Sequence, residues 1–432
     1  MRNFFAFKPR KLVIALTAII LAVVVGTQVH NQPAVASSVC NPTSANRPVC
    51  PSTATAEVAS FLDPTATVNN PGSITVGEKV YVGPFAELDA TNAPITIDEE
   101  SNVQDQVSIV ASGTGVEVGP RVIMAHMATV KGAAHIATQG STGPFTNSTT
   151  NTQFNNNPAE TFLSFNCEVD GATIEKNTVV SALSRVGPGV TLPAGKVVLP
   201  GKNVTTNQEA SDGSLGKVTD LTQADVSLME GIVEVNEAFA KGYTDLARAD
   251  LTNLTGINYA PATFFNPGGL PKLNGVTTRK PNFRNRIIGD VVIQDSLNTL
   301  REHMGSRISL RADEGHPFNI GNLGNAFMSN NVVLHALEHT NLTLGNNVNY
   351  GPRALVHGGK QVVNGVANGS ETSVEESAEL GRNSVVFRSV IGRASTIGRK
   401  SAVVNSTLPQ NTSISNKTIY INDGAVILSV EW

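Results

Sequence analysis

The chain has 432 residues, of which 40% are hydrophobic and 15% are charged. This composition is too apolar for a disordered chain, and the length exceeds that of one ordinary domain, so we expect two folded units. The formal net charge is -4 and the sequence pI is about 6.1. There is no basic surplus to attract phosphate backbones, so we do not expect nucleic acid as a partner.

Residues 1–36 follow the order of a secretory signal peptide. Four basic residues precede the apolar stretch 12–26, and the small residues 34–36 follow it. The apolar stretch is shorter than the roughly 20 residues that a spanning helix needs. We therefore predict cleavage after Ala36, with membrane anchoring by residues 12–26 as the alternative. The mature protein is expected outside the cytoplasm, in the periplasm or in a thylakoid lumen.

The next segment, residues 37–58, contains two of the three cysteines. Cys40 and Cys50 flank a short stretch rich in Pro, Asn and Ser, and an oxidising compartment would allow them to form a disulfide. Cys167 is left without a partner in the sequence. We interpret it as a small side chain packed within a β-structure.

Residues 59–250 and 284–432 share a period of six in their hydrophobic residues. The first region contains the series Val76, Val82, Leu88, then Val118, Met124, Val130, Ile136, then Ile174, Val180, Val186, Leu192, Val198. The second contains Leu344, Tyr350, Val356, Val362 and then Ile391, Ile397, Val403. A helix has a period of 3.6 and a simple strand a period of two, so neither explains the pattern.

A parallel β-helix explains a period of six. Three short strands form one triangular coil, the apolar residue of each hexapeptide points inward, and coils stack at the strand spacing of about 4.8 Å. The sequence therefore predicts a mainly β protein with two parallel β-helices. A single coil cannot bury its apolar face alone, so we expect the stacks to be capped at their ends.

Residues 221–246 interrupt the first region with apolar residues at helical spacing. Thr222 or Asp225 is available as the N-cap. We expect this helix to pack along the first β-helix. The following residues, 251–283, are rich in Asn, Gly, Pro and Thr without periodicity, which indicates a linker between the two domains.

Several short motifs resemble those of the γ-class carbonic anhydrases. The second region has Arg311, Asp313 and Glu314 in "RADEG", His335 and Glu338 in "LHALE", and His357 in "LVHGG". The first region has Asn102, Gln104 and Asp105 in "SNVQDQV", and His126 in "MAHMATVKGA". The resemblance covers most of residues 60–250 and 285–420. The first region and its helix, "GIVEVNEAFAKGY", also resemble the anhydrase-like domain of carboxysome scaffold proteins.

Each region lacks motif residues that the other retains. In the first region, the positions of the first and third family histidines are Val110 and Lys131, and those of the Arg and Asp are Leu88 and Ala90. In the second, the Asn-x-Gln-Asp motif has become residues 327–330, and the middle histidine is Pro352. Independent decay would sometimes remove the same position from both regions. No motif position is missing twice, which favours one composite site over two decayed ones.

The resemblance implies left-handed coils and a metal held between adjacent β-helices. Two histidines would come from one β-helix and the middle one from its neighbour, which here gives His335, His357 and His126. The implied metal is zinc, with iron or cobalt as alternatives, and the implied reaction is hydration of carbon dioxide to bicarbonate.

The resemblance also implies roles for the other motif residues. Gln104 and Asn102 would orient water or substrate, and Glu314 and Glu338 would transfer protons to buffer. Arg311, Asp313 and Asp105 would form ion pairs that hold the domains together. Because family members are trimers of β-helices, we also expect homo-oligomers formed through β-helix faces.

Two alternatives remain open at this stage. A non-catalytic structural or bicarbonate-binding protein would bind no metal stoichiometrically. A hexapeptide-repeat acyltransferase shares the coil and needs a base histidine, but it does not need the "RADEG", "HALE" and "VHGG" motifs, so we rank it last.

Overall fold

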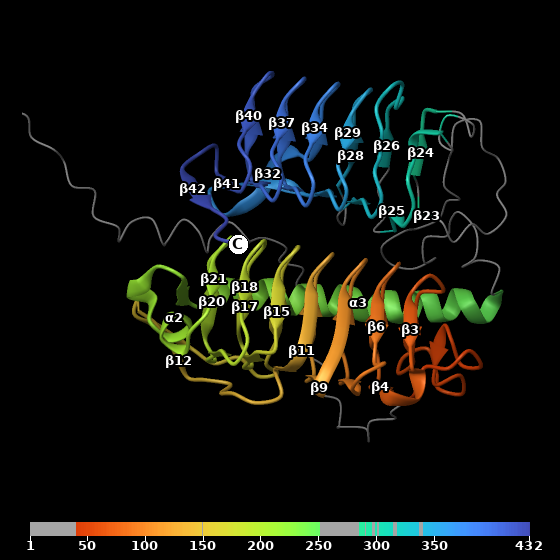
Figure 1. Ribbon diagram of the computed structural model, residues 1–432, viewed down its shortest axis with the longest axis vertical. Helices are drawn as coiled ribbons and strands as arrows, with labels where there is room; N and C mark the ends of the chain where they lie inside the picture. Colours follow the sequence, from red (N-terminus) through yellow and green to blue (C-terminus); the bar gives the residue numbers. More distant parts are fainter. Residues whose placement is uncertain are drawn as a thin grey trace, which may run out of the picture.

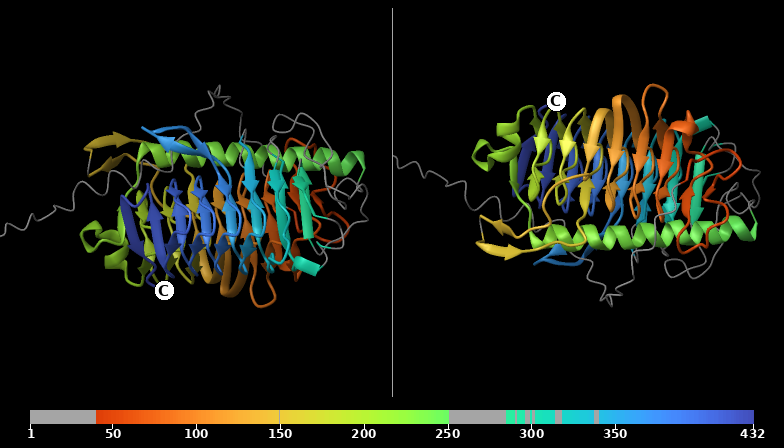
Figure 2. Two further views of the ribbon diagram at one scale, coloured as in Figure 1. Left: turned by 90° about the horizontal axis from the view of Figure 1, so that it is seen from above. Right: turned by 90° about the horizontal axis from the view of Figure 1, so that it is seen from below.

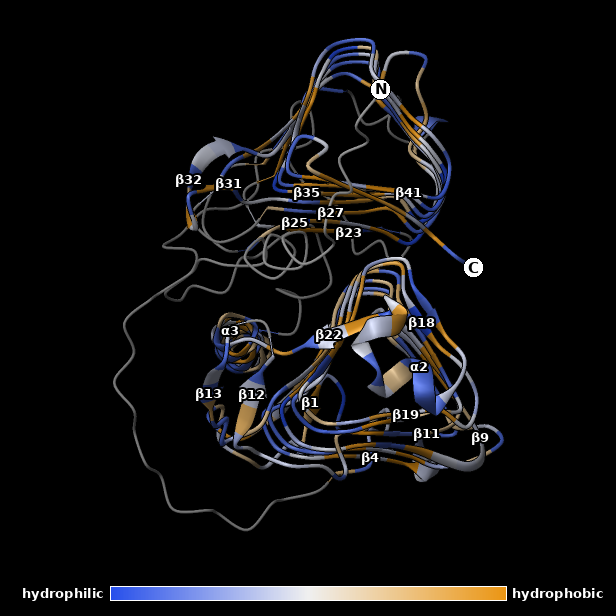
Figure 3. Ribbon diagram, turned by 90° about the vertical axis from the view of Figure 1, so that its left-hand side faces the viewer, coloured by the Kyte–Doolittle hydropathy of each residue, from blue (hydrophilic) through white to orange (hydrophobic). Residues whose placement is uncertain are grey.

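The computed structural model describes residues 40–148, 150–250, 285–289, 291–295, 299, 302–313, 318–336 and 340–432. The predicted signal peptide 1–36 and linker 251–283 lie outside the described residues. Two stacks of short parallel strands lie side by side with their axes aligned, as Figures 1 and 2 show, and each is triangular when viewed end-on (Figure 3). The predicted fold class, a mainly β protein of two left-handed parallel β-helices, is confirmed. The period of six predicted the parallel coils, and the resemblance implied their hand.

The first β-helix is built from short strands on three sides of a triangle. One side consists of β1 (Val49–Cys50), β2 (Ser60–Leu62), β5 (Tyr81–Val82), β8 (Asn102–Val103), β10 (Val122–Met124), β14 (Thr161–Leu163), β17 (Val179–Val180), β20 (Lys196–Val198) and β22 (Val218–Asp220). The second consists of β3 (Thr67–Asn69), β6 (Glu87–Asp89), β9 (Ser108–Val118), β11 (Thr129–Ile136), β15 (Glu168–Asp170), β18 (Arg185–Val186) and β21 (Asn203–Val204). The third consists of β4 (Ile74–Val76), β7 (Ile95–Ile97), β16 (Thr173–Ile174), β19 (Thr191–Leu192) and the ends of the long strands β9 and β11.

The second β-helix repeats this plan. Its first side consists of β23 (Asn285–Gly289), β25 (Ile308–Ala312), β27 (Val333–His335), β30 (Leu355–His357), β35 (Val385–Phe387), β38 (Ala402–Val404), β41 (Thr418–Ile421) and β42 (Val426–Ser429). The other sides are β24 (Val291–Ile293), β26 (Phe318–Ile320), β28 (Leu342–Leu344), β33 (Ser373–Val374), β36 (Val390–Ile391), β39 (Thr407–Leu408), and β29 (Asn349–Tyr350), β34 (Glu379–Leu380), β37 (Thr396–Ile397), β40 (Ser413–Ile414). Antiparallel partners lie at stack ends: β1 on β2, β22 on β20, and β42 on β41.

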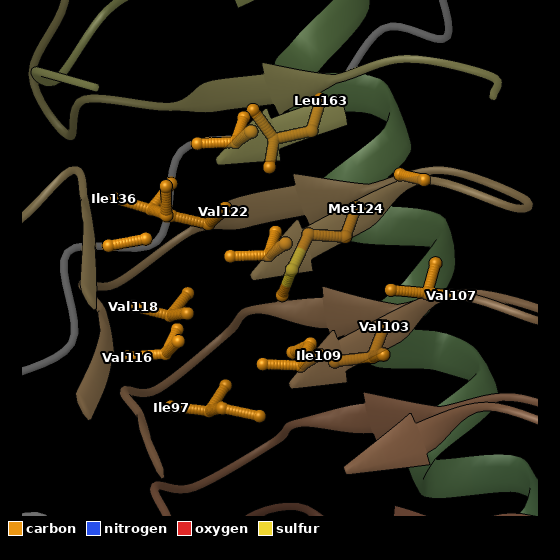
Figure 4. Close-up of a cluster of buried hydrophobic side chains, with 14 of the residues drawn as sticks. Ile97, Val103, Val107, Ile109, Val116, Val118, Val122, Met124, Ile136 and Leu163 are labelled. Carbon is orange, nitrogen blue, oxygen red and sulfur yellow. The ribbon is translucent and has the colours of Figure 1, made fainter. Parts of the chain in front are cut away.

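The inward residues of each stack form a separate core. Figure 3 shows the two stacks end-on. In the first β-helix, Val103, Met124 and Leu163 stack on one side and Val118 and Ile136 on another, as Figure 4 shows. The period-six residues predicted to point inward are buried with one exception. That exception is Val362, which is only half-buried because it lies in a hairpin and not in a coil.

Two β-hairpins project from the coils. One joins β31 (Lys360–Val363) to β32 (Val366–Glu371), and its turn residues Asn364 and Gly365 both have positive φ, 52° and 80°. An Asn-Gly pair with positive φ at both positions favours a tight hairpin turn, which explains why the rhythm fails at Val362. The other hairpin joins β12 (Phe145–Asn147) to β13 (Thr152–Phe154).

Helix α3 spans Gln223–Ala249 and begins at the N-cap Thr222, whose side chain accepts a hydrogen bond from the backbone N–H of Asp225. The Asp225 carboxylate accepts in return from the Thr222 backbone N–H, which completes a capping box. The helix packs on β2, β5 and β10, so its predicted place along the first β-helix holds. It also contacts the second β-helix, because Ile288 lies in the same buried cluster as Phe239 and Tyr243. Short helices η2 (Pro71–Ser73), α2 (Asn207–Ser211) and η3 (Gly213–Leu215) complete the fold.

A corner of the first β-helix contacts a flat side of the second (Figure 3). The apolar part of this interface combines Met127 and Leu183 of the first β-helix with Val333, Leu355 and Val385 of the second. Polar contacts also cross the interface. Arg286 and Asp63 form a buried ion pair at 2.8 Å, and the backbone N–H of Glu431 donates a hydrogen bond to the Gly201 carbonyl at 2.9 Å.

The three cysteines lie in two different environments. Cys40 and Cys50 form a disulfide near the start of the first stack. Cys167 is a free, buried cysteine in the core, and burial raises the pKa of its thiol. Among the described residues, no helix is both long and apolar enough to cross a membrane.

Candidate metal centre

Two of the predicted ligands come from neighbouring strands of the second β-helix. His335 ends β27 and lies directly opposite His357, which ends β30. The same row continues to Arg311 on β25 and to Phe387 on β35. Leu334 and Val356, one residue earlier in each strand, point into the core, so the alternation of a strand directs both histidines outward.

The third predicted ligand comes from the first β-helix. His126 follows β10 at the corner that contacts the second β-helix, and the next residue, Met127, has a positive φ of 64°. The backbone at this corner is held by a hydrogen bond from Met127 N–H to the Asp105 carbonyl at 3.0 Å. This tight turn presents the His126 ring to the row of histidines opposite.

The three histidines form a compact buried cluster. Their ring centroids lie 4.9 Å apart for His335 and His357, 5.2 Å for His126 and His335, and 5.4 Å for His126 and His357. Each residue offers one ring nitrogen such that the three nitrogens all lie within 4.8 Å of one another. His126 Nε2 and His335 Nδ1 are 3.1 Å apart. All three side chains are buried.

This geometry fits a tetrahedral zinc ion. Nitrogens bound at 2.0–2.1 Å in a tetrahedron lie about 3.3 Å apart. His126 Nε2 and His335 Nδ1, at 3.1 Å, are already near that separation. The other pairs lie within 4.8 Å and need only small side-chain movements. Three imidazoles with one coordination position left over are the ligand set of a catalytic zinc site.

The outer nitrogens of two histidines face carboxylates. His126 Nδ1 lies 3.6 Å from Asp105 Oδ1, and His335 Nε2 lies 3.6 Å from Asp313 Oδ1. His357 Nδ1 lies 3.3 Å from the Gly358 carbonyl oxygen. At 3.6 Å the two carboxylate contacts are longer than hydrogen bonds. Acceptors in these places favour the proton on the outer nitrogen, which would leave the inner nitrogen as a metal ligand.

Arg311 joins the two carboxylates across the domain boundary. Its Nη1 donates to Asp105 Oδ1 of the first β-helix at 2.6 Å, and its Nη2 donates to Asp313 Oδ2 at 2.6 Å. The guanidinium also lies over the ring of Phe239 in α3, 4.9 Å from its centroid. The sequence assigned these three residues to ion pairs that hold the domains together. The Arg311–Asp105 pair crosses the domain boundary, whereas the Arg311–Asp313 pair lies within the second β-helix. The same two carboxylates also face the histidines.

Burial and charge set the protonation of the cluster. Burial, followed by the charge of His335, holds the pKa of His126 well below its usual value. Burial likewise lowers the pKa of His357. For Asp313, burial raises the pKa, but Arg311 and His335 outweigh it and the net pKa is lowered. His126 and His357 are therefore neutral beside an ionised Asp313 at neutral pH, and these are the states that metal binding requires.

The remaining predicted site residues differ in how close they lie to the histidine cluster and in whether the structure describes them. Gln104 immediately precedes Asp105 at the same corner and is buried. Asn102 lies in β8 between Tyr81 and Ile123, which both pack against α3, and neither atom of its buried amide has a hydrogen-bond partner in the described part of the chain. Glu314 and Glu338 lie outside the described residues.

Three side chains at the site were not predicted. Phe165 and Phe387 stand beside His357, with ring centroids 5.2 Å and 5.3 Å from its ring. Tyr243 of α3 donates a hydrogen bond to Asp313 Oδ2. The aromatic residues make one side of the cluster apolar. No motif marked Phe165 or Phe387, and Tyr243, which ends the segment "GIVEVNEAFAKGY", had no predicted role at the site. The contacts of all three depend on how the two domains dock.

The face of the first β-helix that corresponds to the histidine row has a different character. Lys131 occupies the place of the third histidine and forms ion pairs with Glu168 at 3.0 Å and Asp170 at 3.5 Å. Arg185 pairs with the same two carboxylates at 2.9 Å and 2.7 Å. This face holds a charged network where the second β-helix holds the histidines.

The fold and the cluster together define a class: a tandem left-handed, hexapeptide-repeat β-helix protein with a buried histidine cluster between its two domains. No protein-family model matches the sequence, and no curated protein matches it.

Solved structures with the same type of coil are distant from this chain. A putative acetyltransferase from Bacillus cereus is 14% identical with a TM-score of 0.22, covering 43% of this chain and 94% of its own. A hexapeptide transferase family protein from Anaplasma phagocytophilum is 17% identical with a TM-score of 0.20, covering 43% and 93%. The UDP-N-acetylglucosamine acyltransferase of Francisella novicida is 11% identical with a TM-score of 0.12, covering 85% and 69%. Values this low carry no conclusion about activity.

Proposed function

We propose that this protein is an exported carbonic anhydrase with one composite zinc site per chain, which hydrates carbon dioxide to bicarbonate. The observation that supports the proposal is the convergence of His126, His335 and His357 from two domains, with one nitrogen of each within 4.8 Å of the others. Iron or cobalt would suit the same nitrogens. The sequence motifs that contain these three histidines resemble those of γ-class carbonic anhydrases.

The chain's own residues have defined tasks in this proposal. The three histidines hold the metal, and zinc, when bound, supplies Lewis acidity that lowers the pKa of water to about 7. Asp105 and Asp313 would hold the outer protons of His126 and His335 once their 3.6 Å contacts shorten, and Arg311 fixes both carboxylates. Phe165 and Phe387 provide an apolar wall suited to carbon dioxide. Gln104 and Asn102 are assigned to orient water or substrate, and Glu314 and Glu338 to carry protons to buffer.

Metal content and stopped-flow carbon dioxide hydration of the mature chain test the proposal. We expect one zinc per chain and hydration activity, and both should be lost in His126→Ala, because two histidines alone leave the ion under-coordinated. The control is His135→Ala, which removes an exposed histidine paired with Glu117 and should change neither. A folded wild-type protein with no metal and no hydration would contradict the proposal and support a structural or bicarbonate-binding role.

The compartment is part of the proposal. The Cys40–Cys50 disulfide suits an oxidising environment such as the periplasm or a thylakoid lumen. N-terminal sequencing of the protein from its natural host should begin near residue 37. Recovery of an intact N-terminus in the membrane fraction would instead support anchoring by residues 12–26.

A further inference from the structure

One buried charge near the histidine cluster has no counter-ion among the described residues. Arg388 follows β35 and is only 2% exposed. Its Nε and Nη1 are buried without any hydrogen-bond partner. Its guanidinium lies against the ring of Phe387, 5.0 Å from the centroid. Burial lowers its pKa to about 10, so it still carries its proton at neutral pH.

The other large buried arginines of this interface are paired. Arg311 has Asp105 and Asp313, and Arg286 has Asp63 at 2.8 Å. Burying an ion without a partner is costly, because neither water nor an opposite charge replaces its hydration. Nearly every buried polar group in a folded protein has a partner, so a guanidinium that is unpaired among the described residues indicates a partner that lies beyond them.

Arg388 lies beside the proposed metal site. Its backbone N–H lies 3.5 Å from the carbonyl oxygen of His357, the ligand opposite Phe387. The Phe387 ring is close to both groups, because its centroid lies 5.3 Å from the ring of His357 and 5.0 Å from Arg388 Cζ. An anion released from the histidines would therefore be close to Arg388.

We propose that Arg388 is an anion-binding residue that takes bicarbonate as it leaves, or before it enters, the histidine site. Bicarbonate is planar, carries one negative charge and presents two oxygens, which a guanidinium binds by two parallel hydrogen bonds. Arg388 touches no ligand nitrogen, so it acts in binding and not in the chemical step. The choice of bicarbonate rests on the proposed function.

Thermal unfolding in the presence of bicarbonate tests this directly. We expect bicarbonate, but not the same concentration of chloride, to raise the unfolding midpoint of the mature chain both as purified and after metal removal. Arg388→Met should lose this shift, because methionine keeps the apolar stem and removes the charge. The matched control, Arg399→Met, removes an exposed arginine of the same β-helix and should keep the shift.

Kinetics separate this proposal from the proposed function. For bicarbonate dehydration, Arg388→Met should raise KM by about 10- to 100-fold, the loss expected for a charged hydrogen bond, with a much smaller change in kcat. Arg388→Lys should restore part of the affinity. If the metal-free wild type shows no bicarbonate shift, or if Arg388→Met keeps both shift and KM, the Arg388 proposal is wrong even when the enzyme is active. A bicarbonate shift that depends on Arg388 in an inactive protein would support this proposal while the carbonic anhydrase function fails.

Discussion

Two buried arginines near the histidines show how pairing decides the contribution of a charge to stability. Arg311 is held between Asp105 and Asp313, while Arg388 has no partner among the described residues. Removing one member of a buried pair leaves its partner as an uncompensated charge. Removing a charge that is already uncompensated relieves a cost instead.

The two arginines therefore predict opposite changes in stability. Asp105→Asn should lower the free energy of unfolding by about 3–5 kcal/mol, the range for breaking a buried ion pair. Arg388→Met should raise it in the absence of bicarbonate. Urea denaturation monitored by circular dichroism measures both. Glu117→Gln, at an exposed pair with His135, is the control and should cost less than about 1 kcal/mol. Equal stabilities of the two buried variants would refute this account.

The states of the three cysteines predict how many thiols react in the native, the denatured and the reduced protein. Cys40 and Cys50 are joined, and Cys167 is buried with a raised pKa, so it lacks both access and thiolate character. The native protein should show no thiol that reacts with a chromogenic disulfide reagent. Denaturation should expose one thiol, and reduction of the denatured chain should expose all three cysteines. Rapid reaction of the native protein would contradict the buried position of Cys167.

At the residue level, motifs could place His126, His335 and His357 but not their surroundings. A histidine at a fixed offset from an inward residue has a direction that the coil determines, and so the outward orientation of His126 and His357 was predictable. Phe165, Phe387 and Arg388 depend on which corner meets which face, and no local pattern carries that information.

At the scale of elements, hydrophobic period predicted the coils, and local turn signals explain where the period fails. The series through Val356 continued in sequence to Val362, but the Asn364–Gly365 turn diverts the chain into the hairpin of β31 and β32. Helix α3 was predicted over residues 221–246 and spans Gln223–Ala249. Its start follows from the Thr222 cap, while its contact with the second domain was not predictable because it requires the docked interface.

The capping box of α3 gives a prediction at this scale. Thr222→Ala removes the side chain that accepts from the Asp225 backbone N–H, and should lower the free energy of unfolding by about 1 kcal/mol. Thr222→Ser keeps the hydroxyl and is the control. Chemical denaturation of the three proteins measures the difference, and a loss of the same size in Thr222→Ser would show that the cap is not the cause.

At the scale of the whole molecule, two β-helices have different outer faces. The second presents histidines and apolar residues to its partner domain, whereas the first presents Lys131, Arg185, Glu168 and Asp170 on the corresponding face. The homo-oligomer that the sequence led us to expect stays a prediction. If it forms on this charged face, its contacts are electrostatic and screened by salt.

Light scattering coupled to gel filtration checks this prediction at low and high salt. We expect the average mass to fall toward that of one 45.3 kDa chain, or the smaller processed chain, as salt rises. Lys131→Glu should weaken assembly in the same way, whereas Lys360→Glu, in the hairpin, should not. A mass that is unchanged by salt would mean that this face does not mediate assembly.

The corner-to-face contact that unites His126 with His335 and His357 joins parts of a single polypeptide. A site shared between separate chains falls apart on dilution, because its halves must find each other again in solution. Here the tether fixes their effective concentration, so formation of the site is a first-order process. Specific activity should consequently stay constant down to concentrations at which any oligomer has dissociated. The two domains can also carry different residues at the site, because each always pairs with the other domain of its own chain and not with a second copy of itself.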